Sequence, residues 1–365
     1  MCGRNDSGNY MILTIILSAA AIAGAIYLLA LLTDGYFIVS LDEISGRMKL
    51  SNDVAGATLM AMGSSAPELA IALIALLRPG DYSDLGIGTI VGSALFNILV
   101  ITGASAIARP LRITWSIVTR DVVVYIASVG LLLWAFSDNR INMVEASVFI
   151  VFYAVYVGGL IWWSKSTRLA DAEHNVDVEI DIEHGVEVDT LWGKVAELVD
   201  QMFSILVGNP RSQYLRCFVV SIILISAISW VLVEGGITLA NAVGVPPVIV
   251  ALTILAPGTS VPDMISSVVV AKQGRGGMAV ANAVGSNIFD ILIGLGLPWL
   301  LIIVSGRSYI EVMFDGIAAS TWLLLGSVLV LYVFMLTGKR LGKKEGYVLV
   351  GGYIAYVMWM YISRN

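Results

Sequence analysis

Long apolar stretches dominate this sequence and restrict the folds that it can adopt. A helix needs about 20 apolar residues to cross about 30 Å of hydrocarbon, and ten stretches come close to that length or exceed it. They lie at approximately 11–41, 52–77, 85–107, 117–136, 142–163, 213–241, 246–271, 278–304, 311–336 and 346–362. Only 13% of the residues are charged, against roughly a quarter in an ordinary soluble domain. We therefore expect an all-α membrane protein with ten transmembrane helices.

The basic residues indicate how these helices are oriented. If the amino terminus lies outside, 16 of the 21 Lys and Arg residues fall on the cytoplasmic side, as the positive-inside rule requires. The first apolar stretch is too long for the h-region of a cleavable signal peptide, so we expect it to remain as a span. Cys2 and Cys217 would then lie on opposite sides of the membrane, and no disulfide between them is expected. The predicted location is the cell membrane.

Two short segments deep inside apolar sequence repeat each other. Residues 61–68 read AMGSSAPE and residues 256–263 read APGTSVPD, so each segment places a carboxylate one residue after a proline. A second motif follows each of them, GSALFN at 92–97 and GSNIFD at 285–290. A carboxylate in the bilayer core costs several kcal/mol unless it faces a partner or a wet cavity. Matched carboxylates in matched segments therefore indicate a functional site.

The positions of these motifs predict inverted repeats. Five apolar stretches precede the long polar segment at 164–212, and five follow it. An odd number of crossings in each half gives the halves opposite orientations, which is the architecture of many secondary transporters with binding sites at the midplane. We expect a first membrane repeat at 1–163, a cytoplasmic segment at 164–212 and a second repeat at 213–365, with broken helices at the midplane.

Proline should break both repeated helices. Pro67 and Pro262 lack a backbone N–H and obstruct the preceding turn, while Gly63 and Gly258 permit close approach at the break. Carbonyl oxygens freed in this way are tolerated in a bilayer only where they line a protein cavity or meet an ion. A kinked helix that packs Gly and Ser against a neighbour would also explain the small residues, but it would not explain the carboxylates.

Oxygen is the only type of ligand atom that these motifs offer. Ser65 lies three residues before Glu68, as Ser260 does before Asp263, so each pair shares a helix face. Carboxylate, amide, hydroxyl and carbonyl oxygens suit hard cations such as calcium or sodium, and a set without His or Cys argues against zinc or copper. For Asn97 taken alone, a hydrogen bond between helices is an equally good interpretation.

The four motifs resemble the alpha-1 and alpha-2 repeats of the calcium/cation antiporter superfamily, most closely those of the sodium/calcium exchanger family. The resemblance covers about residues 51–107 and 246–303 and implies exchange of sodium for calcium by alternating access, with spans one and six as the mobile pair. It implies that Glu68 and Asp263 are the principal calcium ligands. The other ligands that it implies for calcium and sodium are Ala61, Ser64, Ser65, Ser93, Asn97, Ala256, Thr259, Ser260, Ser286 and Asp290.

Two aspartates bear on whether potassium is carried as well. Asp263 and Asp290 resemble the potassium-dependent branch of that family, but some prokaryotic relatives have an aspartate at the second position without an established potassium requirement. Potassium co-transport with calcium therefore stays open. A proton/calcium exchanger and a cation channel are the alternatives. An intramembrane aspartyl protease is disfavoured because its second motif needs Gly-x-Gly-Asp, whereas residues 294–297 read GLGL.

The remaining expectations concern partners and the polar segment. The expected partners are calcium, sodium and potassium ions and the lipid bilayer, with no cofactor, enzymatic activity, nucleic acid or obligate protein partner. Residues 175–189 alternate with a period of two, which is typical of a solvated hairpin. The eight acidic residues at 171–189 fit either an acidic linker or a regulatory calcium site. Residues 190–207 have one apolar face, which is typical of an interfacial amphipathic helix.

Four charged residues within or beside the apolar stretches are left outside the expected site. Asp34 lies near the middle of the first stretch and Glu234 at the far end of the sixth. Each position is consistent with a mouth of the same cavity and equally with an interface or a gate. Arg120 and Asp121 adjoin a cytoplasmic helix end and should form a local ion pair.

Overall fold

The computed structural model describes a chain that is helical almost throughout. The described residues are 4–48, 56–79, 82–112, 115–166, 191–274, 276–312, 314–338 and 340–362. Among them, six helices are long and apolar enough to cross a membrane, or eight if each of two bent helix pairs counts as one span. The expected helical, multi-pass membrane protein is therefore confirmed in class, whereas the expected number of ten spans stays a prediction.

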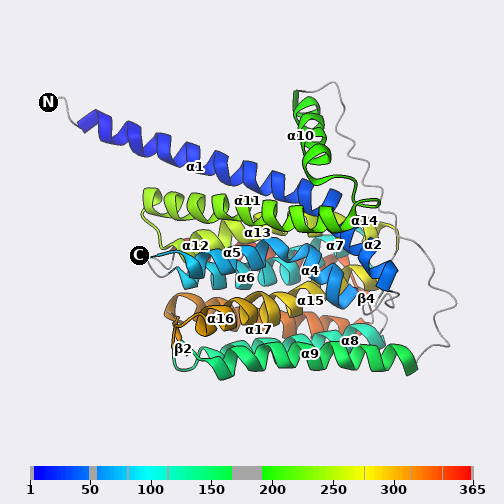
Figure 1. The fold of residues 1–365 in the computed structure, drawn as a ribbon. Helices are drawn as coiled ribbons and strands as arrows, with labels where there is room; N and C mark the ends of the chain where they lie inside the picture. The colour runs from blue at the N-terminus through cyan, green and yellow to red at the C-terminus, as the bar shows by residue number, and fades with distance from the viewer. Residues whose placement is uncertain are drawn as a thin grey trace.

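Two long helices lie side by side along one side of the bundle (Figure 1). The first consists of α1 (Arg4–Leu32), one π-helical segment η1 (Thr33–Phe37) and α2 (Ile38–Met48). Its partner is α11 (Tyr214–Val243). Their buried apolar side chains belong to one core cluster, which also includes side chains of the helix that carries Glu68. The helix predicted at 190–207 lies among the described residues and is confirmed as a helix, α10 (Leu191–Val207). In Figure 1 it stands across the direction of the bundle.

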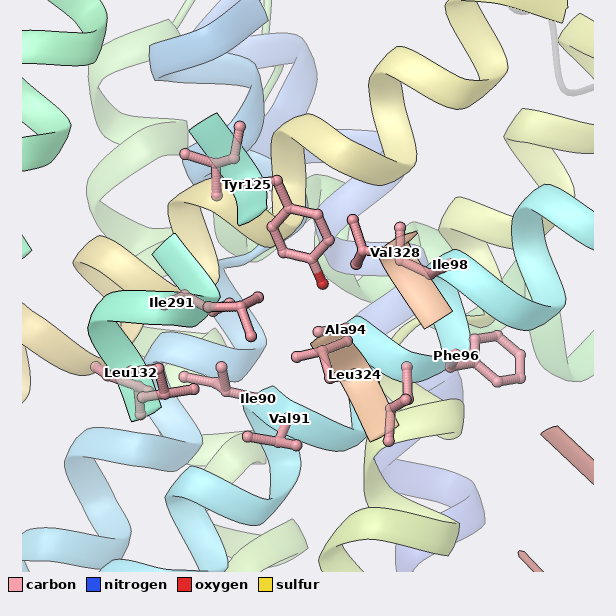
Figure 2. Close-up of a cluster of buried hydrophobic side chains, with 14 of the residues drawn as sticks. Ile90, Val91, Ala94, Phe96, Ile98, Tyr125, Leu132, Ile291, Leu324 and Val328 are labelled. Atoms are coloured by element: carbon pink, nitrogen blue, oxygen red, sulfur yellow. The ribbon is translucent and has the colours of Figure 1, made fainter. Parts of the chain in front are cut away.

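The other helices enclose a second and larger apolar cluster. Figure 2 shows its centre, where side chains from several elements meet, among them Ile90, Tyr125, Ile291 and Leu324. Helices that carry no motif also contribute side chains to this cluster. They are α8 (Trp115–Ala135), α9 (Met143–Ser166), α17 (Phe314–Gly338) and α18 (Lys343–Ile362). The motif helices contribute side chains to both apolar clusters, so much of their surface is buried against other helices.

Both proline motifs break their helices, as the sequence predicts. The first broken helix consists of η2 (Gly56–Met60), α4 (Ala61–Ser64) and α5 (Ala66–Leu77), with a bend of 63°. The second consists of α12 (Pro247–Val250), η5 (Ala251–Leu255), α13 (Ala256–Thr259) and α14 (Val261–Lys272), with a bend of 45°. Each break falls two residues before the proline, at Ser65 and Ser260, where ψ is near 0°. The proline thus occupies the first turn of the next helix, where its missing N–H costs nothing.

The two helices that follow the breaks share a feature that the sequence did not reveal. One consists of α6 (Ser83–Phe96), η3 (Asn97–Ile101) and α7 (Thr102–Ala108), and the other of α15 (Gly276–Phe289), η6 (Asp290–Leu295) and α16 (Gly296–Val304). Each contains a π-helical segment, and each such segment begins at the last polar residue of its motif, Asn97 or Asp290. π-helical turns inside α-helices are frequent at functional sites.

Two short antiparallel strand pairs join segments that precede and follow the polar segment. β1 (Leu111–Arg112) pairs with β4 (Arg340–Leu341), with Leu111 opposite Leu341. β2 (Arg140–Ile141) pairs with β3 (Ile310–Glu311), with Ile141 opposite Ile310. The strands β2 and β4 lie at opposite ends of the bundle in Figure 1. Each end of the bundle is therefore tied between the two halves of the chain.

Several smaller predictions can be placed as well. Arg120 and Asp121 form the expected local ion pair, with Nε 2.8 Å from Oδ1. Glu234 pairs with Arg78 at the end of α5. The thiol of Cys217 is free and buried, while Cys2 and the expected hairpin at 175–189 lie outside the described residues.

Candidate ion-binding site

The four motifs meet where the two halves of the chain pack across each other. The helix after the first break, α5, contacts the π-helical segment η6 of the second half, and α14 after the second break contacts η3 of the first half. A further approach, of α6 to the segments η5 and α13 before the second break, depends on Gly92, because a Cβ there would lie 2.8 Å from Ala256 Cβ and from Leu252 O. Residues that are almost 200 positions apart in the sequence thereby surround one region.

The structure brings the sequence-predicted site residues into the interior. Ser64 and Asp263 are half-buried. The other ten are buried, namely Ala61, Ser65, Glu68, Ser93, Asn97, Ala256, Thr259, Ser260, Ser286 and Asp290. Glu68 is 3% exposed and Asp290 is 1% exposed, so neither carboxylate is hydrated by bulk water. Buried charges of this kind are ordinarily paired or bound to a cation.

Six oxygen atoms of this set are buried and have no hydrogen-bond partner. They are Ser65 Oγ, Glu68 Oε2, Ser93 Oγ, Asn97 Oδ1, Ser260 Oγ and Asp290 Oδ1, six of the ten such side-chain atoms among the described residues. A buried polar atom without a partner costs about 1–3 kcal/mol, and more if it is charged. Their concentration at the two breaks and the two π-helical segments is the pattern expected of ligands for a cation.

Asn97 makes hydrogen bonds between helices, which is one of the two interpretations that the sequence left open, and the sequence did not predict the partners. Asn97 Nδ2 donates to Asn287 Oδ1 at 2.8 Å and to Ser286 Oγ at 3.4 Å. Asn287 Nδ2 in turn donates to Ala94 O at 3.2 Å and to the hydroxyl of Tyr125 at 3.1 Å. Because the amide nitrogen of Asn97 is occupied in this way, its oxygen is the atom left for a ligand. Asn287 occupies the position that matches Ala94 in the first half. This mismatch was the one sign of this hydrogen-bond network in the sequence.

The three carboxylates are near neighbours but do not form one cluster. Glu68 interacts electrostatically with both Asp290 and Asp263. Thr259 lies beside Glu68, and Ser65 lies beside Asp290 without a hydrogen bond of good geometry. Among the described residues, no three His, Cys, Asp or Glu side chains converge closely enough to hold one metal ion. Any ion at this site must therefore be bound by a mixed set of carboxylate, amide, hydroxyl and backbone oxygens.

The backbone carbonyls at the two breaks are already partly engaged. Ala61 O accepts from Ser65 N at 3.0 Å and from Ser64 Oγ at 3.4 Å. Ala256 O accepts from Ser260 N at 3.3 Å and from Thr259 Oγ1 at 3.1 Å. A carbonyl oxygen has two lone pairs. These two oxygens can therefore bind an ion only if the hydroxyl of Ser64 or Thr259 turns away from them.

One acidic residue that the sequence reasoning left out lies at the edge of the site. Asp34 in η1 lines a small cavity together with Thr33, Ser64, Thr259 and Asp263. No local motif surrounds Asp34, so its neighbours were not predictable from spacing. The second residue left out, Glu234, lies elsewhere, in the ion pair with Arg78.

Comparisons with known proteins agree with this architecture. The family model described as "Sodium/calcium exchanger protein" matches residues 17–162 and 214–362. Sodium/potassium/calcium exchanger 4 of Mus musculus is 28% identical over 90% of this chain and 79% of its own length. Exchanger 2 of Gallus gallus is 27% identical over 92% and 76%, and exchanger 5 of Homo sapiens is 29% identical over 89% and 79%.

Solved structures give the same fold. A structure of the sodium-calcium exchanger NCX_Mj soaked with Na⁺ and Sr²⁺ matches 94% of this chain and 98% of its own, with a TM-score of 0.56 and 22% sequence identity. A structure of the same exchanger soaked with zero Na⁺ and Ca²⁺ matches 94% and 99%, with a TM-score of 0.54. At this identity the likeness establishes the fold alone.

Proposed function

Because this chain belongs to the sodium/calcium exchanger family, we propose that it is a secondary active antiporter that exchanges sodium for calcium across a membrane by alternating access. The observation that carries the proposal is the set of six buried side-chain oxygens without partners at the two breaks and π-helical segments. The relatives that it matches are named sodium/potassium/calcium exchangers. These names favour sodium over protons as the counter-ion, and they make potassium the third candidate substrate.

The proposed architecture is ten spans in two inverted repeats of five, at 1–163 and 213–365, with the segment 164–212 in the cytoplasm. The ten proposed spans are the six long helices, the two bent pairs, α8 and α18. From each broken helix onward, a π-helical segment, the break, a second π-helical segment and two strands follow in the same order in both halves. With the amino terminus outside, most Lys and Arg residues face the cytoplasm, and we propose the cell membrane as the location.

In the proposed site, Glu68 and Asp263 bind calcium together with backbone oxygens near Ala61, Ser64, Ala256 and Thr259. Sodium ions use the hydroxyls of Ser65, Ser93, Ser260 and Ser286, the amide oxygen of Asn97 and the carboxylate of Asp290. The support is chemical, because calcium and sodium both prefer oxygen ligands and calcium takes six to eight of them. It is also geometric, because ten of these twelve residues are buried in one region.

Charge neutralisation explains why such a site exchanges ions rather than leaks them. Three carboxylates in a medium of low dielectric constant are costly to bury unless cations compensate them. One calcium ion, with or without a monovalent ion, neutralises most of this charge, and so do several sodium ions. Only the loaded forms can then close and reorient. We propose that α1 and α11, which contact each other and share an apolar cluster with α5, are the pair that moves.

The test is calcium flux into proteoliposomes that contain sodium, for the wild type and for Glu68→Gln. We expect wild-type flux to follow the sodium gradient, and Glu68→Gln to reduce it by at least tenfold, because one calcium ligand loses its charge. Glu197→Gln on the exposed face of α10 is the matched control and should transport normally. Flux that follows a pH gradient and ignores sodium would replace the proposal with proton/calcium exchange, and normal flux in Glu68→Gln would overturn the site assignment.

A further inference from the structure

The helix α10 carries an apolar face that is exposed in the described part of the chain. Leu198, Met202, Ile205 and Leu206 follow each other at the spacing of one helix face, and each is between 48% and 79% exposed. Contiguous exposed apolar side chains mark a site for a protein partner or a membrane. We propose that this face docks in the lipid surface at the proposed cytoplasmic end of the bundle, and that α10 thereby ties the first long helix to the membrane surface. The docking goes beyond the proposed exchange function, whereas its effect on transport rests on that function.

The direction of α10 and its connection to α11 favour lipid as the occupant. α10 stands across the bundle (Figure 1), so it lies along the surface of a membrane that the bundle crosses. A tight turn joins it to α11, in which Gly208 has a φ of +88° and Asn209 Oδ1 accepts hydrogen bonds from the backbone N–H groups of Arg211 and Ser212. Beyond this turn, one side of α11 exposes apolar side chains that a bilayer would cover, namely Leu215, Val219 and Ile223. The exposed face of α10 is therefore followed directly by the lipid-facing side of a proposed span.

The adjacent face of α10 packs on the protein and fixes the position of the helix. Phe203 and Val207 are buried in the apolar cluster that α1, α5 and α11 share. The Phe203 ring meets the Tyr36 ring edge to face, with centroids 6.0 Å apart, and Arg216 donates to two carbonyl oxygens in the last turn of α10. The remaining face is polar and exposed, with Glu197, Gln201 and Ser204. A helix that is apolar towards the protein and towards one outer side, and polar on the other, suits the interface, where such helices insert about 5–10 Å deep.

One tyrosine connects α10 to both of the helices that we propose to move. The hydroxyl of Tyr36, in η1 of the first long helix, donates to Asp200 Oδ1 at 2.9 Å and to Asp200 O at 3.0 Å. The backbone carbonyl of Tyr36 accepts from Cys217 Sγ of α11 at 3.3 Å. If α10 is held in the lipid surface, the first long helix can move along the membrane normal only by breaking the bonds to Asp200 or by pulling α10 out of the lipid.

The first experiment locates α10 in the full-length protein in phosphatidylcholine vesicles. An environment-sensitive fluorophore is attached to Ile205→Cys or, as the matched control on the polar face, to Glu197→Cys. Both are made in a Cys2→Ser background, in which the remaining thiol, that of Cys217, is buried, and the background protein itself measures unspecific labelling. We expect a nitroxide near the lipid headgroup to quench the probe at position 205 about twofold more than the probe at 197, and aqueous iodide to do the reverse.

Two results of this experiment would overturn the inference. Quenching of the probe at position 205 by iodide alone would mean that the face lies in water. Quenching by neither agent would mean that protein covers the face, such as a second copy of this chain. Because no transport is measured, the proposed exchange function is untouched by either result.

The second experiment tests the connection through Tyr36 by sodium-driven calcium flux. Tyr36→Phe removes the hydroxyl but keeps the ring against Phe203. We expect it to raise the maximal rate by about threefold, because the movement no longer has to break a hydrogen bond of average strength. Tyr27→Phe, on an exposed part of the same helix, is the matched control, and Asp200→Asn should stay near the wild type because it keeps an acceptor oxygen.

A lower melting temperature of Tyr36→Phe with an unchanged rate would show a merely structural contact and would overturn the inference. A wild type without sodium-driven flux would instead refute the proposed function, and the link to transport with it, while the position of the probes would still report the docking of α10.

Discussion

At the scale of single residues, Asp290 is where the two halves of the site differ most. Asn97 has the matching position in the first half, and each residue begins a π-helical segment. The carboxylate of Asp290 is 1% exposed, one of its oxygens has no partner, and Glu68 is its charged neighbour. An extra carboxylate at one of two matched positions adds one negative charge that the transported ions must balance.

We predict that Asp290→Asn abolishes potassium dependence of calcium flux and leaves at least part of the sodium-driven flux. The reason is that the variant removes one charge but keeps an oxygen ligand of the same shape. The measurement is calcium uptake into sodium-loaded proteoliposomes with and without potassium. The swap Asn97→Asp with Asp290→Asn restores the net charge on the other half, so recovery of the potassium response would show that charge rather than location matters. Unchanged ion dependence in Asp290→Asn would contradict the prediction.

The sequence reveals a site residue only when the residues next to it in the chain mark it. Glu68 and Asp263 stand out because a carboxylate beside a proline in apolar sequence is costly and rare. Asn287 and Tyr125 could not be found in this way, since their roles arise from hydrogen bonds between helices far apart in the sequence. Asp34 was visible as a charge, but its place beside Asp263 depends on how the first helix packs.

At the scale of secondary-structure elements, the motifs GSALFN at 92–97 and GSNIFD at 285–290 look alike in sequence but pack differently. A Cβ on Gly92 would lie within 3 Å of Leu252 and Ala256 on the second broken helix, whereas a Cβ on Gly285 would meet nothing within 4 Å. The sequence predicted the two breaks because proline marks them. It could not predict the π-helical segments, because the extra residue shifts the phase of the helix faces and the stretches around these segments are apolar on most faces. Nor could it predict strand pairs of only two residues.

This difference predicts opposite effects of the same substitution. Gly92→Ala should destabilise the protein by about 1–3 kcal/mol, the usual cost of overpacking, because backbone atoms of Leu252 stand in the way. Gly285→Ala, its matched control, should be neutral or stabilise by up to about 1 kcal/mol, since alanine favours a helix over glycine. Thermal unfolding of the two variants in the same detergent measures both. Equal losses of stability would mean that the close approach of α6 to the second broken helix does not exist in the membrane.

At the scale of the whole molecule, one ion pair joins the proposed moving helices to the rest of the protein. Arg78 at the end of α5 pairs with Glu234 of α11, and the Arg78 guanidinium also lies 5.3 Å from the centre of the Tyr82 ring. The pair lies at the end of the bundle that carries β3, because Ser83 at the start of α6 bonds to Glu311 O. In the proposed orientation this end is external, and we predict that the ion pair stabilises the form that is closed on the outer side.

Breaking the pair should therefore shift the protein towards the form that is open to the outside. The side chains of Arg78 and Glu234 are 27% and 31% exposed, and a pair that solvent reaches is worth about 0.2–1 kcal/mol. Apparent affinity scales with the population of the competent form, so Glu234→Gln should raise the apparent affinity for external calcium by at most about fivefold and lower that for internal calcium. Right-side-out and inside-out vesicles measure the two affinities separately. The double variant Arg78→Glu with Glu234→Arg should return both towards wild type, whereas equal changes on both faces would mean that the pair affects stability and not the choice of open side.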